Sequence, residues 1–203
     1  MVNSAISVKN HVKDSTIQKS SVETQEAMEE IKYNQIVMEI LNDNLLTYHY
    51  QPIVRATDGS VYAYEALMRA QKGGVSPLQI IQCATYMDRL ADVEKATRLN
   101  VTKDVENNIE SFAGAKVFLN SLPGVEISEK DDELFCQRIR QNSGRFVVEF
   151  TEESELDDDD LNRLKEKYNQ LGNQIALDDY GAGYSNVNNL LRYMPNYVKI
   201  DRM

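Results

Sequence analysis

Along most of the chain, short apolar runs alternate with longer segments in which apolar residues recur every three or four positions. Runs of the first kind predict buried strands, and segments of the second kind predict helices. The predicted strands cover residues 47–54, 61–70, 115–122, 145–151, 174–180 and 197–201. The predicted helices cover residues 24–46, 76–112 with interruptions, 128–141, 156–171 and 184–193.

The first two strands differ from the others because the tight turn Asp58-Gly59 joins them. Asp-Gly between two apolar runs is a hairpin signal, so this pair is expected to be antiparallel. Each later strand follows a helix, which favours a parallel sheet with covering helices, as in a β/α barrel. Six strands are predicted where such a barrel has eight. We therefore expect an α/β fold with an incomplete TIM-type barrel whose first strand is antiparallel.

The sequence predicts a flexible tail or linker followed by one folded domain. Residues 1–23 are rich in Ser, Lys and Asn without a sustained period, which predicts a flexible tail or linker. Residues 24–203 are expected to form one domain, with a leading helix over 24–46 and the barrel portion over 47–203. Cys83 and Cys136 lack metal-binding spacing, and we interpret both as buried or idle thiols in a reducing compartment.

The formal net charge of −10 argues against nonspecific binding to duplex nucleic acid or to an anionic membrane surface. It does not exclude a nucleotide ligand held by metal ions or local cations. No apolar run approaches the roughly 20 residues of a membrane span, and the first ten residues lack the apolar core of a signal peptide. A cytoplasmic location is therefore expected.

Polar residues near the carboxyl ends of the predicted strands are the main functional signal. In a β/α barrel these ends meet on one rim, where active sites lie. A single strand-end carboxylate is most often solvated or ion-paired, but several acids together need cations between them. Oxygen ligands suit Mg²⁺ or Mn²⁺ better than Zn²⁺. The residues are Glu65, Asn120, Glu149, Asp178, Asp179 and Lys199.

The adjacent carboxylates of Asp178 and Asp179 fit a pair of metal ions, with one carboxylate bridging. Two ions about 3.5–4 Å apart stabilise both the attacking and the leaving oxygen in phosphodiester hydrolysis. Lys199 is suited to hold the attacking water or to screen the developing charge. Arg69 lies four residues after Glu65 and shares its strand face, where it would suit a phosphate clamp.

Five segments, in order, resemble the signature blocks of the EAL-domain family, bacterial phosphodiesterases that linearise the second messenger cyclic di-GMP. They are YHYQPIV…YEALMR, FLNSLP, VVEFTE, ALDDYGAGYS and YVKIDR, between Tyr48 and Arg202. The resemblance implies a modified TIM barrel with an antiparallel first strand. It also implies a two-metal site for Mg²⁺ or Mn²⁺ and hydrolysis of cyclic di-GMP to linear pGpG.

The resemblance assigns roles to individual residues. It makes Glu65, Asp178 and Lys199 catalytic. The implied metal ligands are Glu65, Asn120, Glu149, Asp178 and Asp179. The residues implied to contact the dinucleotide are Gln51, Arg69 and Asp201, and Glu152 would anchor the loop that begins at Tyr180.

The chain departs from the family pattern in three places. Ala182 stands where the family often has Thr, and QIIQCATYM lacks an acidic residue that is common there. The family continues after KIDR through two further β/α units, which supply another glutamate at the metal site and a glutamine near the ligand. We therefore expect the second metal to be incompletely ligated in this chain, and catalysis by the isolated 203 residues to be weak or absent.

An open barrel side has two further expected consequences. Apolar inner residues of VVEF and IALDD should face the open space, and the chain should be marginally folded or associate, for example as a homodimer, through its free edges. The alternative to an enzyme is a catalytically inactive receptor that binds cyclic di-GMP, or a protein-interaction module, of the same fold. An upstream sensory or cyclase domain is a further expected partner in the parent protein.

Overall fold

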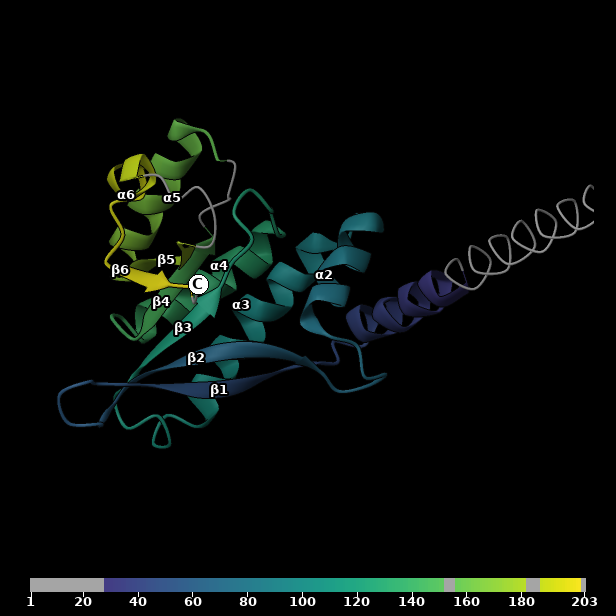
Figure 1. The fold of residues 1–203 in the computed structure, drawn as a ribbon, viewed down its shortest axis with the longest axis horizontal. Coiled ribbons are helices and arrows are strands. Elements are labelled where there is room, and N and C mark those ends of the chain that lie inside the picture. Colours follow the sequence, from purple (N-terminus) through teal and green to yellow (C-terminus); the bar gives the residue numbers. More distant parts are fainter. Residues whose placement is uncertain (1–27, 152–155, 182–186, 202–203) are drawn as a thin grey trace, which may run out of the picture.

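The computed structural model describes residues 28–151, 156–181 and 187–201, with side chains except those of residues 187–189. The strands form one six-stranded sheet in the order β1-β2-β3-β4-β5-β6 (Figure 1). Their bounds are Leu46–Val54, Val61–Ala70, Lys116–Asn120, Phe146–Thr151, Gln174–Tyr180 and Tyr197–Ile200. β1 runs antiparallel to β2, and each later strand runs parallel to the one before it. The predicted hairpin and parallel sheet are confirmed.

A helix over residues 28–42 leads into β1, and the other helices connect the strands. Their bounds are α2 Pro77–Tyr86, α3 Leu90–Asn107, α4 Glu129–Gln141, α5 Asp158–Gln170 and α6 Val187–Tyr193. No helix among the described residues is both long and apolar enough to span a membrane.

The leading helix ends four residues earlier than expected. Asn44 adopts a left-handed conformation with φ of 49°. The amide of Leu45 donates to the carbonyl of Ile40 at 2.8 Å, and the amide of Asn44 donates to that of Leu41 at 3.4 Å. This pair of bonds is the Schellman arrangement that terminates helices. The turn lets β1 begin at Leu46, one residue earlier than predicted.

Polar residues fix the starts of the later helices. Ser128 caps α4 as a side-chain acceptor for the amide of Asp131, at 3.2 Å. Asp157 caps α5 in the same way for the amide of Asp160, at 2.8 Å. The acidic run Asp158–Asp160 fills the first turn of α5, where carboxylates are favoured by the helix dipole.

The main core lies between the helices and the outer face of the sheet. Strand residues such as Leu119, Val148 and Leu177 are fully buried there and pack with helix residues such as Ile40 and Phe135. The free cysteines Cys83 and Cys136 are also buried in this core. The helical layer thus covers the outer face and leaves the inner face of the sheet for other contacts.

The sheet curls into part of a barrel. Tyr62 lies on β2 and Tyr197 on β6, yet their hydroxyl oxygens are 2.7 Å apart. Three strands separate β2 from β6, and in a flat sheet four interstrand steps would place them about 19 Å apart. Both tyrosines pack against a small inner cluster, defined by Ala63, Phe118, Val147 and Ala176. The expected α/β barrel-type fold is confirmed, with the sheet not closed.

One expectation about the open side is wrong. The inner residues of VVEF and IALDD do not face open space, because Val147 and Ala176 are 0% exposed within the inner cluster. The curl of the sheet brings the ring of Tyr197 to 5.1 Å from that of Phe118, which covers them. On the edge strand β6, by contrast, Val198 is 41% and Ile200 79% exposed.

Candidate metal site

The predicted metal ligands form the next layer of side chains above the inner cluster. Side chains two positions apart on a strand lie on the same face. Two residues after each of Ala63, Phe118, Val147, Ala176 and Tyr197 come Glu65, Asn120, Glu149, Asp178 and Lys199. The alternation that buries the apolar layer therefore directs these five residues to the inner face, near the carboxyl ends of the strands.

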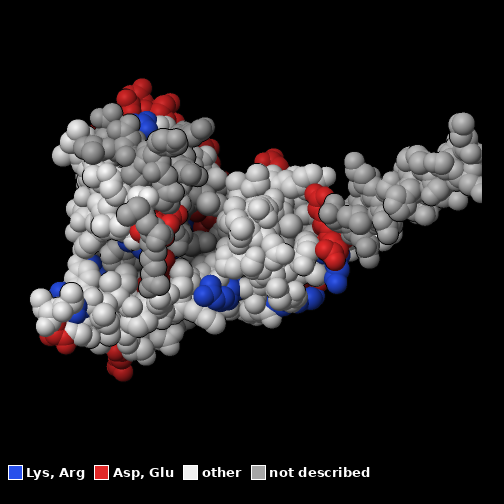
Figure 2. Space-filling view, in the orientation of Figure 1, with Lys and Arg blue, Asp and Glu red and all other residues white. Residues whose placement is uncertain are grey.

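Three of these side chains meet in an acidic cluster, defined by Glu65, Glu149 and Asp178. One carboxylate oxygen from each lies within 4.8 Å of the other two. The Nζ of Lys199 lies 2.9 Å from Glu65 Oε1, 2.9 Å from Glu149 Oε1 and 2.7 Å from Asp178 Oδ2. Figure 2 shows acidic side chains in a hollow near the middle of this face. The ammonium group thus neutralises part of the cluster's charge.

Glu149 is the most enclosed member of the acidic cluster. Its side chain is 0% exposed. Lys199 approaches Oε1 outside hydrogen-bond geometry, so neither carboxylate oxygen has a hydrogen-bond partner among the described residues. Burial raises the pKa of Glu149 to about 7, although Lys199 acts in the opposite direction. The ion pair with Lys199 offsets part of the cost of burying this carboxylate, and a metal ion would offset more of it.

Lys199 keeps its positive charge in this setting. Burial alone lowers the pKa of its ammonium group, but the neighbouring carboxylates of Glu149, Asp178 and Glu65 outweigh that effect. The pKa is therefore held above its usual range. In the absence of a metal, Lys199 is the cation that the cluster contains.

An irregularity in β5 separates the roles of the two adjacent aspartates. The pairing of β5 with β6 shifts between Leu177 and Tyr180, and Asp179 has a left-handed φ of 57°. The amide of Asp179 donates to Asp178 Oδ1 at 2.9 Å. Such irregularities re-aim side chains near active sites. Asp178 joins the acidic cluster, whereas Asp179 is exposed beside it and its ligand role stays a prediction.

Two other predicted residues lie next to the acidic cluster by register. Gln51 on β1 pairs directly with Glu65 on β2, so the two side chains share a face. Asn120 ends β3 in register with Glu149 and is exposed.

The remaining predicted residues lie farther along the rim. Arg69 is partly buried and donates to the carbonyl of Met68 at 2.7 Å. Asp201 follows β6, and its amide donates to the carbonyl of Tyr180 at 3.1 Å. Glu152 lies outside the described residues, so its predicted anchoring role has no structural counterpart here.

A sequence model of the EAL domain matches residues 34–203. The chain belongs to the EAL-domain family. The signature blocks that suggested this resemblance supply the layer of inner-face residues described above.

Known proteins resemble the chain in sequence and in fold. It is 26% identical over 171 residues to the cyclic di-GMP phosphodiesterase PdeR of Escherichia coli, covering 80% of this chain and 26% of PdeR. Its fold resembles Klebsiella pneumoniae BlrP1, solved as a manganese and cyclic di-GMP complex, with a TM-score of 0.65 and 22% identity. That match covers 77% of this chain and 40% of BlrP1.

A second solved structure agrees in fold. The EAL domain of Xanthomonas citri FimX, in complex with cyclic di-GMP, matches with a TM-score of 0.66 and 15% identity. That match covers 87% of this chain and 72% of the FimX chain. The EAL domain described here thus spans about a quarter of PdeR and less than half of BlrP1.

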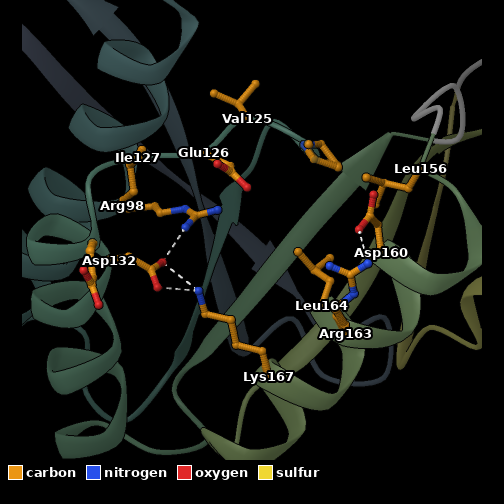
Figure 3. A pocket seen from close by; sticks show the side chains of 13 residues that line it. Arg98, Val125, Glu126, Ile127, Asp132, Leu156, Asp160, Arg163, Leu164 and Lys167 are labelled. Carbon is orange, nitrogen blue, oxygen red and sulfur yellow. Dashed lines mark hydrogen bonds and ion pairs between the residues drawn. The ribbon is translucent and has the colours of Figure 1, made fainter.

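The EAL domain also has a cavity away from the acidic cluster. It has a volume of about 540 Å³ and lies between α4, α5 and the segment that follows β3 (Figure 3). The cations that line it are already paired. Arg98 and Lys167 contact Asp132 at 3.0 and 2.6 Å, and Arg163 contacts Asp160 at 3.1 Å. The described residues that line this cavity offer an anionic ligand no unpaired cation, so the acidic cluster is the better candidate site.

Sequence reasoning missed a buried ion pair beside the rim of the EAL domain. Glu94 is 1% and Arg98 6% exposed, and Arg98 Nε donates to Glu94 Oε1 at 2.6 Å. A signal for this pair was present in the sequence. Both residues lie on the face of α3 that also carries the buried Val93 and Val101, where charged side chains are rare unless they are paired.

Proposed function

We propose that this EAL domain is a divalent-metal-dependent phosphodiesterase that hydrolyses one phosphodiester bond of cyclic di-GMP to linear pGpG. The observation that carries the proposal is the buried carboxylate of Glu149, which lacks hydrogen bonds and lies beside Glu65 and Asp178. Three carboxylates on the rim of a barrel need a cation, and the single charge of Lys199 offsets only part of theirs. The names of PdeR and of the BlrP1 complex support the choice of metal and ligand.

The residues of the acidic cluster would hold Mg²⁺ or Mn²⁺, together with Asn120 beside them. These are oxygen ligands, which both ions prefer. When bound, such an ion acts as a Lewis acid and lowers the pKa of a bound water. Asp179 would be a ligand to a second metal ion, and its neighbour Asp178 would be a ligand to the first.

The other rim residues would bind and orient the dinucleotide. Lys199 is placed to hydrogen-bond the attacking water or a phosphate oxygen. Gln51 would contact a guanine edge, Arg69 would pair with a phosphate, and Asp201 would bind the ligand beside β6. Glu152 is proposed to anchor the loop after β5.

The proposed reaction replaces one bond to phosphorus by another. The water oxygen forms a new bond to phosphorus, and the bond between phosphorus and the 3′ oxygen breaks. One proton of the water goes to the leaving 3′ oxygen, and the other goes to solvent as the new 5′-phosphate ionises. A water-derived oxygen therefore ends in pGpG.

Binding and turnover need to be measured together, on the 203 residues and on any longer natural polypeptide that includes them. We expect Glu65→Ala and Asp178→Ala to abolish pGpG formation with Mn²⁺ present. Asp159→Ala, on the exposed first turn of α5, is the matched control and should retain wild-type turnover. If the wild-type polypeptide binds cyclic di-GMP but never forms pGpG, the non-catalytic receptor is the correct function.

A further inference from the structure

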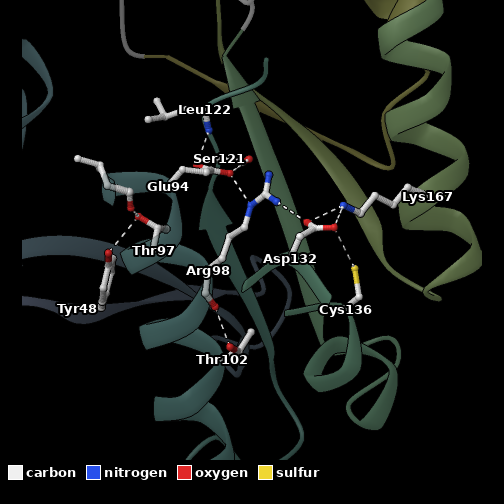
Figure 4. A network of polar contacts seen from close by, with 11 residues as sticks. Tyr48, Glu94, Thr97, Arg98, Thr102, Ser121, Leu122, Asp132, Cys136 and Lys167 are labelled. Atoms are coloured by element: carbon white, nitrogen blue, oxygen red, sulfur yellow. Dashed lines mark hydrogen bonds and ion pairs between the residues drawn. The ribbon is translucent and has the colours of Figure 1, made fainter. Parts of the chain in front are cut away.

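A buried carboxylate on α3 holds the backbone that follows Asn120. Glu94 Oε1 accepts from Ser121 Oγ at 2.6 Å, and Glu94 Oε2 accepts from the amide of Leu122 at 2.8 Å (Figure 4). Ser121 is itself only 6% exposed. Glu94 thus binds both residues that come directly after the predicted ligand Asn120.

The same short segment is also tied to the neighbouring strand. The amide of Ser121 donates to the carbonyl of Glu149 at 3.0 Å. One hydrogen bond therefore links the residue after Asn120 to the backbone of Glu149. Glu94 fixes this segment from the helix side, while β4 fixes it from the sheet side.

The burial of Glu94 calls for an explanation. A buried carboxylate is costly unless several donors satisfy it. Here the donors are Arg98, Ser121 and Leu122, and two of the three belong to the rim. Asn120 is exposed, so the direction of its side chain depends on the backbone of β3 rather than on packing.

We propose that Glu94 is a positioning residue for the metal site. It holds the carboxyl end of β3 through Ser121 and Leu122, so that Asn120 is aimed at the acidic cluster of Glu65, Glu149 and Asp178. The inference rests on the proposed function, because it takes Asn120 as a metal ligand. Glu94 touches neither metal nor substrate and acts through Asn120.

The far end of the same network provides a matched control. Arg98 NH1 contacts Asp132 Oδ1 at 3.0 Å, and Asp132 in turn contacts Lys167 on α5 (Figure 4). Asp132→Asn weakens these ion pairs without changing a residue of β3 or of its following segment. It tests whether general loosening of the helical layer is enough to disturb the site.

The test measures the Mn²⁺ dissociation constant by electron paramagnetic resonance for the 203-residue chain. Glu94→Gln replaces one accepting oxygen by an NH₂ group, which then faces the groups that donate to Glu94. The substitution should weaken Mn²⁺ binding about 10–100-fold, as is typical of partners that orient metal ligands. Asp132→Asn should change it less than about threefold. In an Asn120→Ala background, Glu94→Gln should add less than about twofold, because the two residues act in series.

A second readout separates this inference from the proposed function. The side-chain amide signals of Asn120, in ¹⁵N NMR spectra of the metal-free chain, should shift or broaden in Glu94→Gln but not in Asp132→Asn. If wild type binds no Mn²⁺ while this NMR pattern appears, the proposed function fails, whereas the hold of Glu94 on the end of β3 and on the Asn120 side chain stands. If Glu94→Gln does not fold, Ser121→Ala should give the same pattern with smaller changes.

The positioning role is overturned by any of three results. The first is an unchanged Asn120 signal in both Glu94→Gln and Ser121→Ala. The second is a loss of Mn²⁺ affinity in Asp132→Asn equal to that in Glu94→Gln. The third is a full, multiplicative effect of Glu94→Gln in the Asn120→Ala background.

Discussion

Lys199 on β6 and Glu65 on β2 form an ion pair of 2.9 Å, although three strands separate them in the sheet. The contact exists because the sheet curls, so the pair joins two distant strands across the inner face. Glu149 and Asp178, from the strands between, contact the same ammonium group. One lysine therefore holds together the layer of side chains that forms the candidate site.

Replacement of that lysine should have opposite effects on metal binding and on turnover. Two like unit charges 4 Å apart repel by about 4 kcal/mol at an effective dielectric near 20. The ammonium group of Lys199 would repel a Mn²⁺ ion bound to the same carboxylates. Partial relief of that repulsion in Lys199→Met should tighten Mn²⁺ binding by at least about tenfold, or 1.4 kcal/mol. Turnover of cyclic di-GMP should fall, since the residue proposed to orient the water is gone. Calorimetric titration measures the affinity for Mn²⁺, and an assay of pGpG formation measures turnover.

Lys199→Met should also destabilise the metal-free chain. Loss of one partner from a buried ion pair costs about 3–5 kcal/mol. Because Lys199 is 25% exposed, we expect a smaller loss, about 2 kcal/mol, in the free energy of unfolding measured with urea. Saturating Mn²⁺ should restore most of it. A variant as stable as wild type without metal would mean that the ammonium group is not what holds the cluster together.

Divalent metal should stabilise the wild-type chain. A ligand bound only to the native state adds about 2.7 kcal/mol at a concentration of 100 times its Kd. For a chain of this size that corresponds to a rise in Tm of about 5–10 °C. Differential scanning fluorimetry with and without Mn²⁺ measures it. Glu149→Ala should abolish the rise and Asp159→Asn should keep it; equal rises in both variants would place the metal elsewhere.

The inner cluster, with the two tyrosines that pack against it, should contribute to stability but not to metal binding. Tyr62→Phe removes the hydroxyl that lies 2.7 Å from Tyr197. Loss of one hydrogen bond costs about 1 kcal/mol, which should lower Tm by about 2–4 °C. The Kd for Mn²⁺ should stay within about twofold of wild type. A large change in Kd would show that the two layers are coupled.

Much of this arrangement could be predicted from the sequence. The Asp58-Gly59 turn indicated the antiparallel hairpin, and the positions of Glu65, Glu149 and Asp178 near the carboxyl ends of their strands indicated that they meet on one rim. These features depend on local chain geometry, which a sequence pattern carries directly. The burial of VVEF and IALDD was predicted wrongly because it depends on how far the sheet curls.

Other features could not be predicted because they arise from tertiary contacts. The irregularity at Asp179 gives the two adjacent aspartates different surroundings, and nothing in the local pattern marks it. The contact between Lys199 and Glu65 requires the curl of the whole sheet. Glu94 is recognised only when α3 is seen against the end of β3, since its partners Ser121 and Leu122 lie almost thirty residues away in the chain.

The most direct test of the metal site is an anomalous-diffraction map from crystals of the chain saturated with Mn²⁺. Our account predicts a strong manganese peak bonded to the carboxylates of Glu65, Glu149 and Asp178, with Asn120 turned toward it and Lys199 displaced from Glu149. A map with no peak at these residues, in which Lys199 still contacts all three carboxylates, would contradict it.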